Sequence, residues 1–349
     1  MKRNILLLVF FVSSVGLLLL VLRSNRQLKF FNQPSLIKSS TLTSPGRQEI
    51  GINVNEIERL NLQNDLQAEI DASGIANNVS LYYKNLPGGY EVTINADRGW
   101  VPASTVKAFI VVEAFRQKHL GLINFDSRVT IKKENVAPTE LGSERYQPLS
   151  PGVKATIREL IDAMITQSDN TAFNTLIDIL DRRNITASLR RLGLDDTVVG
   201  EKLSLSDDQY NIDVAVPGWQ SNRTTARDFG HLFTLLFEDK IDGSEEILTI
   251  FKRHRFADMI PKLLPKGIDV AHKTGVLSPY FHDGGVVYKP NEPFILVVFS
   301  NHDDPDVVAK LAKISYFKTR DVLGTSTTRA WGAIIQVVEK VKILLRNYP

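Results

Sequence analysis

The chain has 349 residues and no cysteine. This absence excludes disulfide bonds, and it excludes the type of lipid anchor that is attached to a cysteine. Histidine is also scarce. The six histidines show neither His-x-His nor His-Glu-x-x-His spacing, which argues against a metal-dependent hydrolase: His119, His231, His254, His272, His282 and His302. We therefore expect no metal and no other cofactor.

An excess of charge of one sign is missing as well. Lysine and arginine number 42, against 39 aspartate and glutamate residues, so the formal net charge is +3. This balance argues against nucleic acid as a partner and allows only weak attraction to an anionic cell wall or membrane. Hydrophobic residues make up 43% of the chain, which is enough for a sizeable core.

The first 23 residues contain the one long apolar run. Lys2 and Arg3 precede the segment 5–22, whose length is close to the roughly 20 residues that a helix needs to cross a bilayer. No Ala-x-Ala pattern follows, so we predict an uncleaved signal anchor over 1–23 rather than a cleaved signal peptide. Residues 24–53 are polar and aperiodic, which predicts a tether. The domain beyond it is expected in the cell envelope, in the periplasm or on the outer face of the cytoplasmic membrane.

The sequence pattern of residues 54–349 predicts a mixed α/β domain. Predicted strands lie near its start and near its end, with helices between them, which predicts an antiparallel sheet flanked by helices. One lobe is expected to combine 54–125 with 226–349, and a helical lobe is inserted over 126–225. The expected strands are 79–85, 90–95, 128–131, 269–272, 282–288 and 294–301, and the expected helices are 56–71, 104–120, 156–165, 171–181, 187–192, 224–238, 245–255, 307–316 and 329–345.

A serine and a lysine begin the helix predicted at 104–120. Residues three apart share one helix face, so the Ser104 hydroxyl and the Lys107 amine can lie side by side. A serine needs a base within hydrogen-bond reach to become a good nucleophile. Burial under the following apolar run would lower the pKa of Lys107, and so would a second cation nearby. This pattern predicts a nucleophile and its base.

The Ser-x-x-Lys pattern is a weak signal by itself, because it recurs at Ser35 with Lys38 and at Ser315 with Lys318. The first of these lies in the predicted tether, and the second is expected on the surface. Two further motifs follow Ser104 in a fixed order: Ser168-Asp169-Asn170 between two predicted helices, and Lys273-Thr274-Gly275 after a predicted strand. Asp283, next to His282, is expected in a loop.

With these three motifs, the chain resembles the superfamily of class A β-lactamases and penicillin-binding proteins. The resemblance runs from about residue 79 to about residue 301. It implies a β-lactamase-like fold with the motifs meeting at the boundary between the lobes, and a substrate that is either a β-lactam or a stem peptide of peptidoglycan. The membrane is expected to be contacted through the N-terminal apolar segment.

The same resemblance implies roles for single residues. Ser104 becomes acylated, Lys107 takes its proton, and Ser168 passes a proton to the leaving nitrogen. The backbone N–H of Val276 would help that of Ser104 to hold the oxyanion. The substrate would be bound by Asn170, Lys273, Thr274 and Gly275.

The chain departs from the class A pattern between residues 195 and 223. The Glu-x-x-Leu-Asn pattern, whose glutamate activates the water that releases the acyl group, is missing there. Glu201 is the one weak candidate for this base. The leading interpretation is an exported class A type β-lactamase. The alternatives are a DD-peptidase acting on D-Ala-D-Ala ends of peptidoglycan, with slow release of β-lactams, and a non-catalytic wall-binding module.

Overall fold

The computed structural model describes residues 54–137, 149–200, 202–203, 222–302 and 304–318. The described residues belong to one compact unit that begins at Asn53. The anchor, the tether and the closing helix 329–345 lie outside them and stay predictions, as does the division into lobes. Within the described part of the chain, no helix is both long and apolar enough to cross a membrane.

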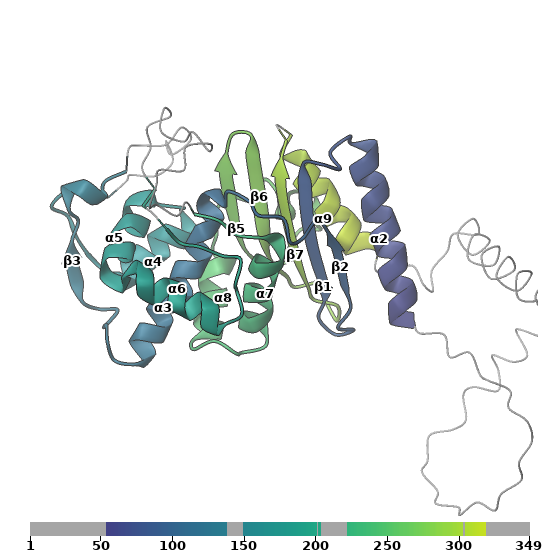
Figure 1. Cartoon of the computed structure of the whole chain (residues 1–349). Helices are drawn as coiled ribbons and strands as arrows, with labels where there is room; N and C mark the ends of the chain where they lie inside the picture. The colour runs from purple at the N-terminus through teal and green to yellow at the C-terminus, as the bar shows by residue number, and fades with distance from the viewer. Residues whose placement is uncertain (1–53, 138–148, 201, 204–221, 303, 319–349) are drawn as a thin grey trace, which may run out of the picture. The chain divides into compact units, whose positions relative to one another are not determined.

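A five-stranded antiparallel sheet forms the centre of this unit, with the strand order β2-β1-β7-β6-β5 (Figure 1). The predicted antiparallel sheet is confirmed. The strand that begins near residue 270 is longer than predicted, so Lys273-Thr274-Gly275 lies inside it. The strands are β1 (Val79–Asn85), β2 (Glu91–Ile94), β5 (Val270–Leu277), β6 (Tyr280–Val287) and β7 (Phe294–Asn301).

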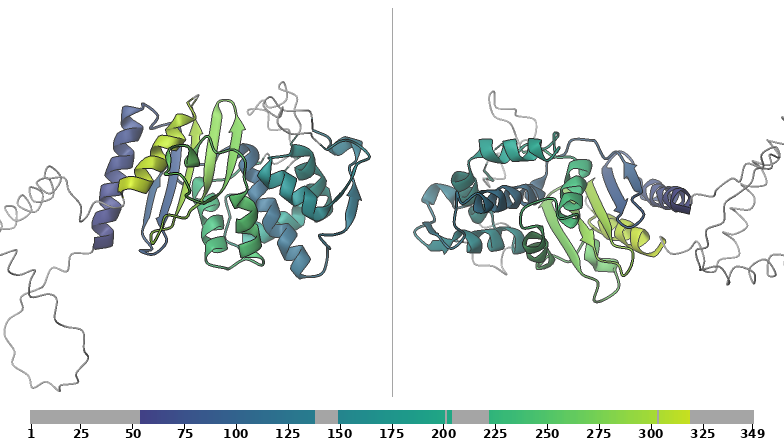
Figure 2. Two further views of the ribbon diagram at one scale, coloured as in Figure 1. Left: turned by 180° about the vertical axis from the view of Figure 1, so that it is seen from behind. Right: turned by 90° about the horizontal axis from the view of Figure 1, so that it is seen from below.

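Both faces of the sheet are covered, which explains the uninterrupted apolar run of β7. Alternate residues of a strand point to opposite faces. Leu296 and Val298 pack with α2 (Val54–Ala72) and α9 (Asp306–Lys318), which lie on one face (Figure 2, left). Ile295 and Val297 belong to a second core cluster, which includes residues of α7 (Ala226–Phe237) and α8 (Ser244–Lys252).

Further helices lie between the two parts of the sheet in the sequence: α3 (Lys107–His119), α4 (Ile157–Thr166), α5 (Asn170–Leu180) and α6 (Arg182–Arg191). α4 begins at a capping box, in which Thr156 and Glu159 cap each other's backbone N–H. This region also holds a two-stranded ribbon of β3 (Arg128–Thr130) and β4 (Lys154–Thr156), although only its first strand was predicted. Short 3₁₀ turns are η2 (Ala103–Val106), η3 (Lys133–Asn135) and η5 (Ile260–Leu263).

The prediction that Ser315 lies on the surface is wrong. Ser315 is on α9, its side chain is fully buried, and its hydroxyl donates to the Leu311 carbonyl at 2.9 Å. This Ser-x-x-Lys pattern therefore uses its serine inside a helix, to satisfy a carbonyl four residues earlier.

Candidate active site

Ser104 lies in a tight turn that is fixed from two sides. It is the second residue of η2, and the residue before it, Ala103, has a φ of 46°, in the left-handed region that few non-glycine residues adopt. Thr105 closes the turn by donating to the Pro102 carbonyl from its backbone N–H at 3.0 Å and from its hydroxyl at 2.5 Å. Ser104 stays partly exposed. The turn therefore presents the hydroxyl of Ser104 while its neighbours are buried.

Lys107 lies directly behind this hydroxyl, as predicted. Its side chain is fully buried, and Nζ lies 2.8 Å from Ser104 Oγ. Nζ also donates to the Ser168 carbonyl at 2.6 Å and to Asn170 Oδ1. These two oxygens can only accept, so they take two N–H groups of the amine. In the neutral amine, the lone pair can then face the Ser104 hydroxyl, which is the arrangement that a general base needs.

The turn between α4 and α5 brings the second motif to the same place. Its three residues have different tasks. Asp169 caps α5 by accepting the Ala172 N–H at 2.6 Å. Ser168, with a φ of 61°, turns its carbonyl and its hydroxyl toward Lys107, and Asn170 points its amide there. The capping function therefore accounts for the aspartate alone, and the other two residues face the lysine.

Strand β5 supplies a second buried lysine. The Lys273 side chain is fully buried, and its Nζ donates to Ser168 Oγ at 3.0 Å and to the Thr274 carbonyl at 2.8 Å. Lys107 Nζ contacts the same Ser168 Oγ at 3.1 Å. Two ammonium groups around one hydroxyl repel each other, and burial removes the water that would screen them. Both effects disfavour two charged lysines side by side.

The backbone of β5 is directed toward the Ser104 turn. β5 is the last strand in the order of the described sheet, and it packs on η2. The N–H and C=O of Thr274 bond to side chains rather than to β6, so they face the outer edge. Val276 lies two residues further along the same strand and shares this orientation. Its N–H therefore faces the outer edge of the strand, and the residue is 53% exposed.

Gly275 is the residue that allows β5 to approach the turn. A Cβ on Gly275 would lie 2.8 Å from the Pro102 carbonyl oxygen and 3.0 Å from the Thr105 backbone nitrogen. Because backbone atoms cannot move aside cheaply, we expect Gly275→Ala to destabilise the fold by about 1–3 kcal/mol. We also expect acylation to slow by about 100-fold, because the strand shifts against Ser104.

Chemical denaturation and acylation kinetics measure the two effects of Gly275→Ala. Gly99→Ala is the matched control, since its Cβ would meet only the flexible Arg223 side chain, at 3.4 Å. An unchanged rate in Gly275→Ala would show that the close approach of strand and turn is not needed for acylation.

Two histidines and an aspartate that looked unimportant in the sequence are buried close to these motifs. His282 and Asp283 begin the strand predicted at 282–288 but were also interpreted as polar groups of a loop. The loop interpretation is wrong, because both residues are fully buried in β6. His272 is inside β5 and contacts Asp283, with Nδ1 and Oδ1 2.8 Å apart. Asp283 Oδ2 also accepts the Ile260 N–H at 3.0 Å. No local pattern signals these contacts, since each joins residues from different elements.

His254 is the residue next to the motifs that the sequence reasoning missed. It follows α8, is 8% exposed, and contacts both Ile165 and Thr274. Burial, together with the nearby Lys273 charge, holds the pKa of His254 well below its usual value. His254 is therefore neutral at physiological pH.

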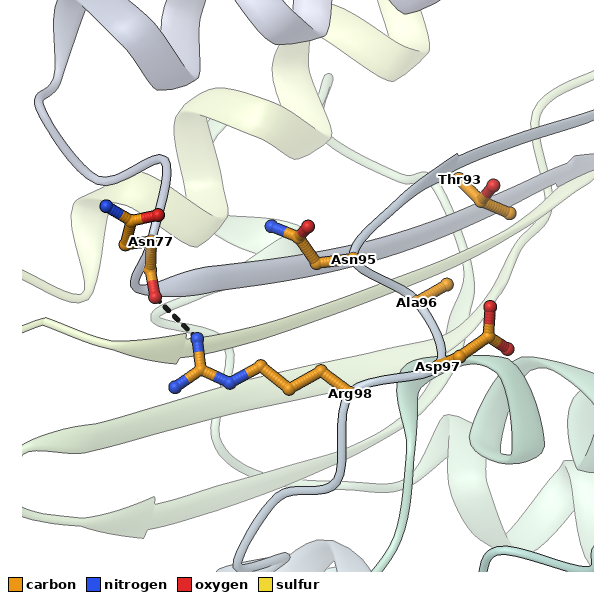
Figure 3. A pocket seen from close by; sticks show the side chains of 6 residues that line it. All are labelled: Asn77, Thr93, Asn95, Ala96, Asp97 and Arg98. Atoms are coloured by element: carbon orange, nitrogen blue, oxygen red, sulfur yellow. Dashed lines mark hydrogen bonds between the residues drawn. The ribbon is translucent and has the colours of Figure 1, made fainter.

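Other features of the described residues contribute no further site. They contain no group of three or more potential metal ligands. A hollow of about 380 Å³ lies on the connection from β2 to η2 (Figure 3), and none of its lining residues belongs to the motifs: Asn77, Thr93, Asn95, Ala96, Asp97 and Arg98. Glu201 lies outside the described residues, so its role stays a prediction.

Comparisons with known proteins show what the chain is similar to. The chain is 28% identical over 222 residues to a β-lactamase of Bacillus licheniformis, covering 62% of this chain and 68% of that one. It is 26% identical over 234 residues to β-lactamase 3 of Bacillus cereus, covering 65% and 71%. Among solved structures, PBP-A is 27% identical with a TM-score of 0.63, covering 73% of this chain and 94% of PBP-A.

Two further structures extend the comparison. A β-lactamase from Sphaerobacter thermophilus shares the fold, with a TM-score of 0.65 at 23% identity, covering 76% of this chain and 99% of that one. A point mutant of PBP-A, solved as an acyl-enzyme complex with penicillin G, is 26% identical with a TM-score of 0.63, covering 74% and 95%. The family model described as "Beta-lactamase enzyme family" matches residues 61–317. The chain belongs to the β-lactamase enzyme family of serine hydrolases.

Proposed function

We propose that the protein opens the amide bond of β-lactams, forms an acyl-enzyme on Ser104 and then hydrolyses it. The observation that carries this proposal is the 2.8 Å contact between the buried Lys107 amine and the Ser104 hydroxyl. β-Lactamases among the relatives and the penicillin complex of the PBP-A mutant support the choice of substrate.

In the acylation step, Ser104 Oγ attacks the lactam carbonyl carbon while its proton passes to Lys107. Backbone N–H groups of Ser104 and Val276 would stabilise the oxyanion. The carbon–nitrogen bond then breaks, and the nitrogen receives a proton through Ser168, whose hydroxyl contacts both lysines. Lys273 would hold the substrate carboxylate, and the Asn170 amide would hold its side-chain carbonyl. Water hydrolyses the resulting ester in a second step, for which Glu201 is the proposed base.

A DD-peptidase with slow release of β-lactams is the second candidate, and one contact favours it. Asn174 lies one helical turn after Asn170 on α5, so both share a face of the helix. Asn174 donates to the Leu203 carbonyl at 3.0 Å and accepts the Leu203 N–H at 2.8 Å. The residue of the 195–223 segment that Asn174 holds is therefore the buried Leu203, and an aliphatic side chain cannot activate water.

We further propose that the domain works outside the cytoplasmic membrane, held there by the apolar segment 5–22. Both substrate classes are met in that compartment. Fractionation of cells that produce the full chain would detect it in the membrane fraction, whereas recovery of the protein in the cytosol would contradict this localisation.

Incubation with benzylpenicillin, followed by intact-mass measurement and chromatography of the drug, separates the candidates. A transient adduct with accumulating hydrolysed penicillin is the expected result. A lasting adduct with little product would instead support the DD-peptidase, and no adduct would contradict both. Ser104→Ala should abolish the adduct, whereas Ser315→Ala, at the buried serine of α9, should keep it. Peptidoglycan binding by Ser104→Ala with no turnover by the parent would indicate a wall-binding module.

A further inference from the structure

His254 joins the turn of the second motif to the strand of the third. Its Nδ1 lies 2.7 Å from the carbonyl oxygen of Ile165, near the end of α4 and three residues before Ser168. A carbonyl only accepts, so Nδ1 carries the hydrogen and Nε2 of the neutral ring is an acceptor. Thr274 uses this acceptor twice, from its hydroxyl at 2.7 Å and from its backbone N–H at 3.3 Å.

At Thr274, the outer edge of β5 cannot pair with another strand. The edge-facing N–H of Thr274 is bonded to His254, and its edge-facing carbonyl accepts the Lys273 ammonium at 2.8 Å. Neither group is left to pair with an added strand. Val276, the next residue of the same orientation, is 53% exposed. An extended substrate can therefore pair with the strand at Val276 and cannot continue along it past Thr274.

We propose that His254 is a positioning residue that ends the substrate-pairing edge of β5 at Thr274, so that the enzyme selects acyl donors whose chain stops there in a free carboxylate. The inference rests on the proposed function, because it concerns the substrate of the same site. A chain that continues as an ester or an amide meets the His254–Thr274 contact. A chain that ends there places its carboxylate beside the Lys273 ammonium. The selection depends on whether the substrate chain extends beyond Thr274, so it is separate from the acylation of Ser104.

The test compares benzylpenicillin with its methyl ester, using kcat/KM for acylation by the full-length protein. We expect the parent to prefer the acid, and His254→Ala to lower the ratio of acid to ester by about ten-fold or more. A merely structural effect of the substitution would slow both substrates equally and leave the ratio unchanged. His119→Ala is the matched control, since this histidine is 65% exposed, and its ratio should equal that of the parent.

Two conservative variants give an independent reading that does not depend on the folding of His254→Ala. Glutamine reaches as far as Nε2 and can accept from Thr274, so His254→Gln should keep most of the preference for the acid. Asparagine reaches only as far as Nδ1, so His254→Asn should keep the Ile165 contact and lose the preference. Equal ratios in the parent, His254→Asn and His254→Gln would overturn the inference. A parent that is not acylated by benzylpenicillin at all would instead overturn the proposed function.

Discussion

Replacing Lys107 with methionine should lower the rate constant for acylation of Ser104 by about 10²–10⁴-fold, the usual contribution of a general base. Methionine fills a similar volume and cannot take the Ser104 proton. The amine lies 2.8 Å from Ser104 Oγ and is fully buried, so bulk water cannot easily replace it as the base. Stopped-flow mixing with a chromogenic cephalosporin measures this rate constant directly.

Lys118→Met provides the control on the same helix. The Lys118 side chain is 37% exposed and pairs with Glu246 on the surface, so its replacement should leave acylation unchanged. Circular dichroism of both variants shows whether the fold is retained. A folded Lys107→Met protein that is acylated within ten-fold of the parental rate would mean that another group deprotonates Ser104.

Acid should destabilise the fold through His282, by about 3 kcal/mol between pH 6.5 and pH 4. Burial lowers the pKa of this side chain from 6.5 to about 4. Its Nε2 donates to the Val101 carbonyl at 2.9 Å, and its Nδ1 accepts the Ser300 N–H at 3.2 Å, so both nitrogens are used by the neutral ring. Above pH 6.5 the ring is neutral in both the folded and the unfolded chain, and this contribution is complete. Between pH 6.5 and 4 only the unfolded chain gains the proton, so stability is lost, and below pH 4 the loss levels off.

Urea unfolding at several pH values from 7 to 4 measures this loss. The carboxylates and His254 titrate as well, so the informative quantity is the difference in slope between the parent and His282→Leu. The variant loses the Val101 contact at every pH, which lowers its stability by a constant amount. Because leucine does not titrate, the variant also lacks the part of the pH dependence that comes from His282. His119→Gln, at an exposed position, should keep the slope of the parent. Equal slopes in His282→Leu and the parent would show that the pKa of His282 is the same in the folded and the unfolded chain.

Local sequence patterns were enough to predict most of the fold. The capping box at Thr156 fixed the start of α4, because both halves of that motif lie within one turn of helix. The alternating and continuous apolar runs located β1, β6 and β7. The short strand β4 was missed, because a three-residue strand is stabilised by its partner β3 rather than by a pattern of its own.

The grouping of the candidate site was predictable from the three motifs, because each contributes a polar side chain that its own local structure does not require. Ser104, Lys107, Ser168, Asn170 and Lys273 form one hydrogen-bonded group, as the order of the motifs implied. His254 and His282 could not be predicted in the same way. Each makes its contacts with residues of other elements, Ile165 and Thr274 for the first and Val101 and Ser300 for the second. Such contacts exist only after the sheet and the helices have packed together.

The central claim is that Ser104, activated by a buried amine, is the group that becomes acylated. Tryptic mapping of the protein after brief exposure to benzylpenicillin tests it most directly, because Ser104 and Ser168 fall in the separate peptides 99–107 and 159–182. The account predicts one penicillin-derived adduct, confined to the peptide of Ser104. An adduct on the peptide of Ser168, or on neither peptide, would contradict it.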